Sequence, residues 1–68
     1  MSPDLMIDPD LLRRVRGEYL EMPGLHLTPR QAERLWGLDA QTCHRLFDAL
    51  LASRFLCRTR IGTFRLAP

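Results

Sequence analysis

The chain of 68 residues contains no lysine, although ten of its residues are basic. All of its basic side chains outside histidine are therefore arginines. Arginine binds phosphate through two parallel hydrogen bonds, so contact with nucleic acid is one explanation of this bias. A genome rich in G and C, which favours arginine codons, explains the same bias without any function, and we prefer this simpler explanation.

Long apolar runs are also missing, since the longest unbroken apolar stretches are a few residues. A membrane-spanning helix needs about 20 largely apolar residues in succession, so none is expected. The N-terminal sequence MSPDLMIDPD lacks the basic start and the apolar block of a secretion signal. We therefore expect a cytoplasmic protein, and Met1 suggests a complete gene product.

Groups that carry catalysis or bind metals are scarce. Cys43 and Cys57 do not form a CxxC pair, and both fall at expected core positions, which indicates buried free thiols. A metal site that adds His26 and His44 meets no known ligand spacing. No paired carboxylate, activated nucleophile or phosphate-binding glycine loop is recognisable. We expect no metal, no cofactor, no disulfide and no enzymatic activity.

The length predicts one small domain with a modest core. An apolar fraction of 46% and a charged fraction of 26% are typical of a folded globular protein. Charge is uneven along the chain: residues 1–10 contain three aspartates and no base, while residues 51–68 contain four arginines and no acid. This asymmetry predicts a basic end that faces phosphate and an acidic end that faces away from it.

A first helix is predicted over residues 9–22. Asp8 caps it, Pro9 takes the first position, and Pro23-Gly24 ends it. Its apolar stripe comprises Leu11, Leu12, Val15, Tyr19 and Met22. Leu25-His26-Leu27 then alternates as in a short strand at the edge of a sheet.

Two further helices are separated by a glycine. Thr28, Pro29 and Gln31 form a capping-box sequence that begins the second helix, and Gly37 ends it in the left-handed conformation. Its inward residues are Ala32, Leu35 and Trp36. Asp39 caps the third helix, whose apolar residues are Ala40, Cys43, Leu46, Phe47, Leu50 and Leu51. The outer face of that helix then comprises Gln41, Thr42, His44, Arg45 and Asp48.

A β-hairpin is predicted at the C-terminal end. Residues 55–60 and 63–66 are rich in strand-forming residues and flank the turn Ile61-Gly62. The predicted fold class is therefore α+β, with the order α-β-α-α-β-β. It forms a single domain over residues 9–66, preceded by a short N-terminal arm, residues 1–8.

This order resembles the winged helix-turn-helix family, in the style of small bacterial MarR-like and IclR-like DNA-binding domains. The resemblance covers nearly the whole chain and is carried by Gly37-Leu38-Asp39, Thr42-Cys43-His44-Arg45, Phe47, Leu50 and Phe55-Leu56. Two positions depart from the family pattern. Glu33 occupies a position that usually holds a small residue, and Arg54 stands where the family often has glycine. A left-handed arginine is uncommon, so Arg54 bears on how the third helix ends.

The resemblance implies that the protein binds double-stranded DNA as a small transcriptional regulator. The third helix would enter the major groove and the hairpin would contact the backbone. The residues expected to read bases are Gln41, Thr42, His44 and Arg45. Those expected to contact phosphate are Arg58, Arg60 and Arg65, with Arg30, Arg34 and the N-terminal amides of the second helix as further candidates. Each arginine has a plain alternative as a solvated surface residue.

Protein binding is the alternative function, because some winged helices serve as adaptors without binding DNA. The net charge is only +2, and Asp39 and Asp48 lie on the supposed reading helix. The all-arginine hairpin favours DNA. One such module buries about 600–1,000 Å² on DNA, which is little for high specificity. We therefore expect a homodimer or a partner protein, with the first helix as the additional contact surface.

Overall fold

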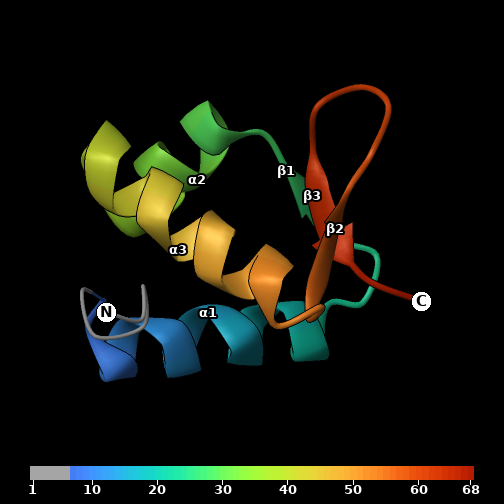
Figure 1. The fold of residues 1–68 in the computed structure, drawn as a ribbon, viewed down its shortest axis with the longest axis horizontal. Helices are drawn as coiled ribbons and strands as arrows, with labels where there is room; N and C mark the ends of the chain where they lie inside the picture. Colours follow the sequence, from blue (N-terminus) through green and yellow to red (C-terminus); the bar gives the residue numbers. More distant parts are fainter. Residues whose placement is uncertain (1–6) are drawn as a thin grey trace.

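The computed structural model describes residues 7–68. Most of the predicted N-terminal arm, residues 1–6, lies outside this range. Within residues 7–68 the chain forms three helices and a three-stranded antiparallel sheet (Figure 1). The helices are α1 (Pro9–Glu21), α2 (Pro29–Trp36) and α3 (Ala40–Ala52), and the strands are β1 (His26–Leu27), β2 (Leu56–Arg58) and β3 (Phe64–Leu66). The predicted α+β class and element order are confirmed.

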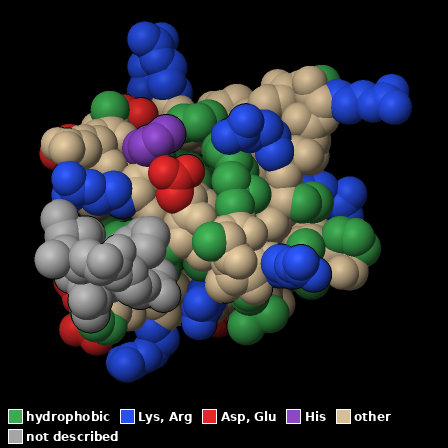
Figure 2. Space-filling model, viewed as in Figure 1, with side chains coloured by type: hydrophobic (Ala, Val, Ile, Leu, Met, Phe, Trp, Pro, Cys, Tyr) green, Lys and Arg blue, Asp and Glu red, His purple; other side chains and the backbone are tan. Residues whose placement is uncertain are grey.

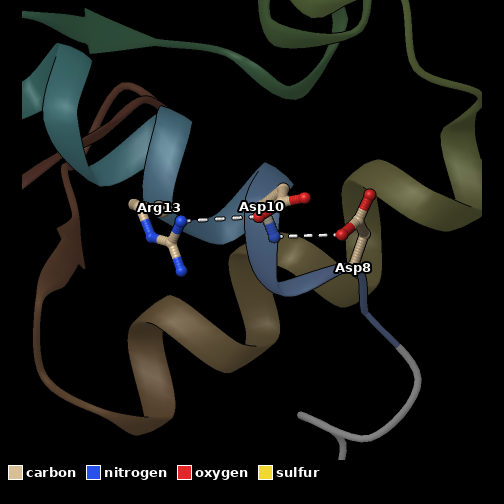
Figure 3. A network of polar contacts seen from close by, with 3 residues as sticks. All are labelled: Asp8, Asp10 and Arg13. Atoms are coloured by element: carbon tan, nitrogen blue, oxygen red, sulfur yellow. Dashed lines mark hydrogen bonds and ion pairs between the residues drawn. The ribbon is translucent and has the colours of Figure 1, made fainter.

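Each helix begins at the cap that the sequence predicts. The Asp8 carboxylate accepts a hydrogen bond from the Asp10 amide at 2.9 Å, and Asp10 in turn lies 3.5 Å from Arg13 (Figure 3). Thr28 and Gln31 form the complete capping box of α2. Gly37 ends α2 with φ of +63°, a conformation that glycine adopts without steric cost.

The sheet places the hairpin at one end of the molecule. Its strand order is β1-β3-β2, so the short strand before α2 pairs with the last strand of the chain. In β3, Phe64 lies opposite Leu27 and Arg58, and Arg65 lies opposite His26 and Cys57. Figure 1 shows the loop between β2 and β3 extending at the top right, away from α1 along the bottom, with α3 running between α1 and α2.

The core gathers around Tyr19. Its ring lies 6.5 Å from the rings of both Trp36 and Phe55, and its hydroxyl donates a hydrogen bond to the Phe64 carbonyl at 2.9 Å. Burial, with a smaller contribution from Cys43, raises the pKa of Tyr19 to about 12. The buried apolar residues are Ile7, Val15, Tyr19, Leu27, Ala32, Trp36, Cys43, Leu46, Phe47, Ala49, Leu50, Leu56 and Phe64. This core joins all three helices to the sheet.

Several predicted core positions are wrong. Met22 is 57% exposed because the backbone leaves the helix there, and Leu35 is 52% exposed because Ala32 and Trp36 already occupy the inward side of the short α2. Ala40 is exposed in the first turn of α3, and Cys57 is only half-buried on β2.

Two further differences concern α3 and the hairpin. The sequence did not predict Ala49 as a core residue, although its side chain is buried beneath α3. The two hairpin strands are also shorter than predicted, because the turn already begins at Thr59. Among residues 7–68, no helix combines the length and apolar character needed to cross a membrane.

Candidate nucleic-acid interface

The solvent-facing stripe of α3 is the first part of the candidate interface. Gln41 lies three and four residues before His44 and Arg45, which in turn lie four and three residues before Asp48, so all four share one face of the helix. Gln41, His44 and Asp48 are exposed and Arg45 is half-buried. The opposite side of α3 is fixed in the core by its buried residues, so this stripe cannot rotate inward. We call these four side chains the α3 stripe.

Thr42 does not belong to the α3 stripe. It lies one step around the helix from Gln41 and is half-buried. Its amide donates a hydrogen bond to the Asp39 carboxylate at 2.8 Å. Hydrogen bonding with Thr42, first through its side chain and then through this amide, lowers the pKa of Asp39 below its usual value. Of the residues predicted to read bases, the structure therefore brings together Gln41, His44 and Arg45, with Thr42 beside them.

Acidic groups reduce the positive potential of α3. Asp39 stands ionised at the N-terminal end of the helix, where its charge interacts favourably with the helix dipole. His44 Nε2 lies 3.3 Å from Asp48 Oδ2, in a pair whose side chains are 78% and 54% exposed. The spacing of four residues on a helix was a sequence signal for this contact. His44 is thus engaged on its own helix, which leaves Gln41 and Arg45 as the free donors of the α3 stripe.

Arg58 is tied to α3 by a stack of side chains. Its guanidinium carbon lies 5.4 Å from the centre of the Phe64 ring, and that ring stacks on Phe47 of α3 with centroids 4.1 Å apart and planes 12° apart. A cation over an aromatic face is held by the ring quadrupole. Arg58 and Phe64 are cross-strand partners, so both lie on the sheet face toward α3. The stack therefore fixes a hairpin arginine relative to α3.

Arg60 projects from a well-ordered turn. The Thr59 amide donates to the Thr63 carbonyl at 2.8 Å, and the two threonine hydroxyls are 2.6 Å apart. Gly62 has φ of +84°, which other residues rarely adopt, and its amide donates to the Thr59 carbonyl. Arg60 is exposed, and the neighbouring Ile61 is 77% exposed. The tip thus offers one free cation and one apolar side chain.

Arg65 lies on the other face of the sheet. Its neighbour Phe64 is buried toward the helices, and successive residues of a strand point to opposite faces. Arg65 therefore shares the outer face with its cross-strand partners His26 and Cys57. It also lines a shallow pocket with Pro23, Gly24, His26, Thr59, Ile61 and Thr63. The structure does not bring Arg65 together with Arg58 and the α3 stripe.

Two arginines on α2 complete the predicted set. Arg30 and Arg34 are exposed and four residues apart, so they share one side of α2. The N-terminal amides of α2 were a predicted phosphate contact. The capping box already engages two amides here: that of Gln31 bonds to the Thr28 hydroxyl, and that of Thr28 bonds to the Gln31 side chain. Fewer free donors are therefore left for a phosphate than the sequence suggested.

The basic side chains are dispersed. Figure 2 shows arginines scattered over the visible face and along its edge, separated by hydrophobic and other side chains, with no continuous basic patch. A compact anion would need several of these charges close together, and the visible face shows no such group.

Comparison with known proteins gives no match: no family model, no curated protein and no solved structure is significantly similar to this chain. Within residues 7–68, no group of three or more histidine, cysteine or acidic residues is arranged to hold a metal ion. Cys43 is buried, and that burial, with a smaller effect from the charge of Glu33, raises the pKa of its thiol to about 11. Its thiol is therefore protonated at neutral pH.

Proposed function

We propose that this protein is a winged-helix DNA-binding domain that acts as a small transcriptional regulator in the cytoplasm. In this proposal α3 enters the major groove, and the hairpin contacts the sugar–phosphate backbone. The observation that carries the proposal is the stack Arg58–Phe64–Phe47, which couples a hairpin cation to the helix that bears the α3 stripe. A duplex that meets one of these two elements is thereby positioned to meet the other.

Base reading is assigned to Gln41 and Arg45. Glutamine pairs through two hydrogen bonds with adenine, and arginine does so with guanine in the major groove. Gln41 lies in the first turn of α3 and is exposed, while Arg45 follows one turn later on the same stripe. His44 is paired with Asp48 and is assigned no base contact. Thr42 is positioned to contact a sugar or a phosphate at the edge of the stripe.

Backbone contacts are assigned to Arg58 and Arg60, with Arg30 and Arg34 as the flanking contacts on α2. All four side chains are exposed. Phosphate contacts set position and affinity but carry no sequence information. Arg65 receives no role in this docking because it lies on the outer face of the sheet.

A protein-binding adaptor is the second candidate. The observation that favours it is the acidic content of α3: the ionised Asp39 at its start and Asp48 within the stripe. Both carboxylates oppose an approaching phosphate. The adaptor function requires no basic surface, so the two candidates differ in their response to salt.

The deciding experiment is a fluorescence anisotropy titration with a labelled duplex of mixed sequence at about 50 and 200 mM salt. We expect micromolar binding at the lower salt that weakens steeply at the higher salt. The variant with Arg58→Ala and Arg60→Ala should bind less tightly and with a smaller salt dependence. Arg14→Ala on the exposed side of α1 is the control for charge alone, since it removes one positive charge outside the proposed interface, against two in the double variant. Absence of binding at low salt would refute the proposal and leave the adaptor function.

A further inference from the structure

The outer side of α1 carries an apolar groove that is separate from the α3 stripe and the hairpin. Val15 and Tyr19 turn the other side of this helix into the core. The groove is lined by Pro9, Leu12, Arg13, Arg16, Gly17 and Leu20. These residues recur at steps of three and four, so they form one continuous stripe along the helix. We call this stripe the α1 groove.

The floor of the α1 groove is open and apolar. Leu20 is 63% exposed and Leu12 is half-buried. Gly17 has no side chain, and a Cβ atom at this position would meet nothing within 4 Å. The fold therefore has room for a larger side chain at residue 17, so crowding does not explain the glycine. A glycine inside a helix lowers its stability relative to alanine, and here it leaves the groove between the two leucines unfilled.

Arginines form the edge of the groove. Arg16 lies with its guanidinium carbon 5.5 Å from the Phe55 ring, and Phe55 packs edge-on against Tyr19 of the same helix. The turn that follows α3 is thereby held against α1 (Figure 1), and the exposed Arg54 directly precedes Phe55 in this turn. On α1 itself, Asp10 contacts Arg13, and Glu21 is the last residue of the helix.

Arg54 has a backbone conformation that favours glycine. Its φ is +63°, and it is the one described residue other than glycine, among residues 7–68, with positive φ. The amides of Arg54 and Phe55 donate to the carbonyls of Leu51 and Leu50, which closes the end of α3. Glycine would close the same turn at lower steric cost. The arginine thus adds a charge next to Phe55, the residue that Arg16 contacts, at a position where the backbone disfavours a side chain.

We propose that the α1 groove binds an acidic amphipathic helix of a partner protein. Apolar side chains of the partner would fill the space over Leu12, Gly17 and Leu20. Its carboxylates would pair with Arg13, Arg16 and Arg54 around the edge. The proposed DNA contacts use neither the groove nor its arginines. This proposal can therefore be tested separately from the proposed function.

A second copy of the chain fits the groove less well than an acidic partner does. A two-fold contact through the same face would bring Arg13 and Arg16 of one copy against the arginines of the other. Like charges brought together out of water repel strongly. The arginines at the edge of the groove therefore disfavour a homodimer formed through the first helix, which was one expectation from the sequence. They favour a partner of opposite charge.

The test uses a synthetic helical peptide with leucine at positions i, i+3, i+4 and i+7 and glutamate on its remaining faces. A matched peptide carries lysine in place of each glutamate. We expect saturable, submillimolar binding of the acidic peptide by fluorescence anisotropy and none of the lysine peptide. Leu20→Ser and Arg16→Glu should each weaken the acidic peptide about tenfold. Ile61→Ser, which removes another exposed apolar side chain at the distant hairpin tip, should leave the affinity unchanged.

Arg54→Gly removes the arginine side chain without destabilising the fold, because glycine suits the backbone conformation at this position. Any loss of peptide affinity in this variant is then due to the lost side chain. The substitution should weaken the peptide severalfold in a protein that unfolds at no lower temperature than the parent. The proposal is overturned if the two peptides bind alike, or if the acidic peptide fails to saturate the groove. It is also overturned if sedimentation shows a dimer that Leu20→Ser dissociates, since the groove would then be a self-contact.

Discussion

Residues 37 and 54 have the same left-handed φ of +63° but carry opposite kinds of residue, a glycine and an arginine. Each closes the end of a helix, Gly37 after α2 and Arg54 after α3. A residue with a Cβ atom costs about 1–2 kcal/mol in this conformation. Glycine avoids that cost but loses about 0.5–1 kcal/mol more conformational entropy on folding. The difference predicts opposite effects for two reciprocal substitutions.

Arg54→Gly should stabilise the protein, and Gly37→Ala should destabilise it. A Cβ atom at Gly37 would meet nothing within 4 Å, so no clash adds to the backbone cost. The net effect is about 0.5–1 kcal/mol in each case, with opposite sign. For a domain of this size that corresponds to about 2–8 °C in Tm, upward for Arg54→Gly and downward for Gly37→Ala.

Thermal unfolding followed by circular dichroism measures both effects under the same conditions. The double variant should return close to the parent Tm, because the two turns are separate and their effects should add. A lower Tm for Arg54→Gly would refute the reasoning. It would mean that the Arg54 side chain makes a stabilising contact worth more than the backbone strain.

Four further predictions concern DNA binding and the core. Arg58→Ala with Arg60→Ala should weaken binding to every duplex, and the slope of log K against log salt should fall by about 0.9 per lost phosphate contact; an unchanged slope places those contacts elsewhere. Gln41→Ala should alter sequence preference in a selection from random duplexes, whereas retained preference would move the reading face away from α3. Tyr19→Phe should destabilise the fold by about 1–3 kcal/mol, since the buried Phe64 carbonyl loses its donor. The raised pKa of Tyr19, about 12, predicts that the free energy of unfolding is unaffected by this group below pH 10 and falls as pH rises toward 12, because only the unfolded state ionises readily there. Urea denaturation across this pH range should show a smaller fall in the Tyr19→Phe variant, and an equal fall would assign the effect to other groups.

Helix boundaries could be predicted because their signals are local. Asp8, Thr28 and Asp39 each bind an amide two or three residues ahead, so the cap and its partner lie in the same short stretch of sequence. Gly37 likewise ends α2 through its own backbone angle. The predicted element order follows from these signals together with the alternation of the hairpin.

The side to which each arginine points was harder to predict. The alternation Phe64-Arg65-Leu66 already indicated that Arg65 faces away from Phe64, yet family position alone grouped it with the other hairpin arginines. The contact of Arg58 with Phe64 depends on the register across the turn, which the sequence did not fix. The packing of Phe64 on Phe47 joins residues far apart in the chain and follows only from the assembled core.

Exposure on the short α2 was mispredicted for a related reason. Ala32 and Trp36, one turn apart, fill the inward side of α2. The Trp36 ring nitrogen donates a hydrogen bond to the Glu18 carboxylate of α1. No room is left for Leu35, whose apolar character alone suggested burial. A domain this small has room for few buried side chains. The spacing of apolar residues along a helix therefore does not show which of them are buried.

The proposed DNA-binding surface consists of the α3 stripe and the hairpin, and amide chemical-shift mapping tests it most directly. A mixed-sequence duplex would be titrated into isotopically labelled protein at low salt. We predict the largest shifts at residues 41–45 and 58–62, with the α1 groove unaffected. Shifts confined to α1, or none at saturating duplex, would contradict the proposed function.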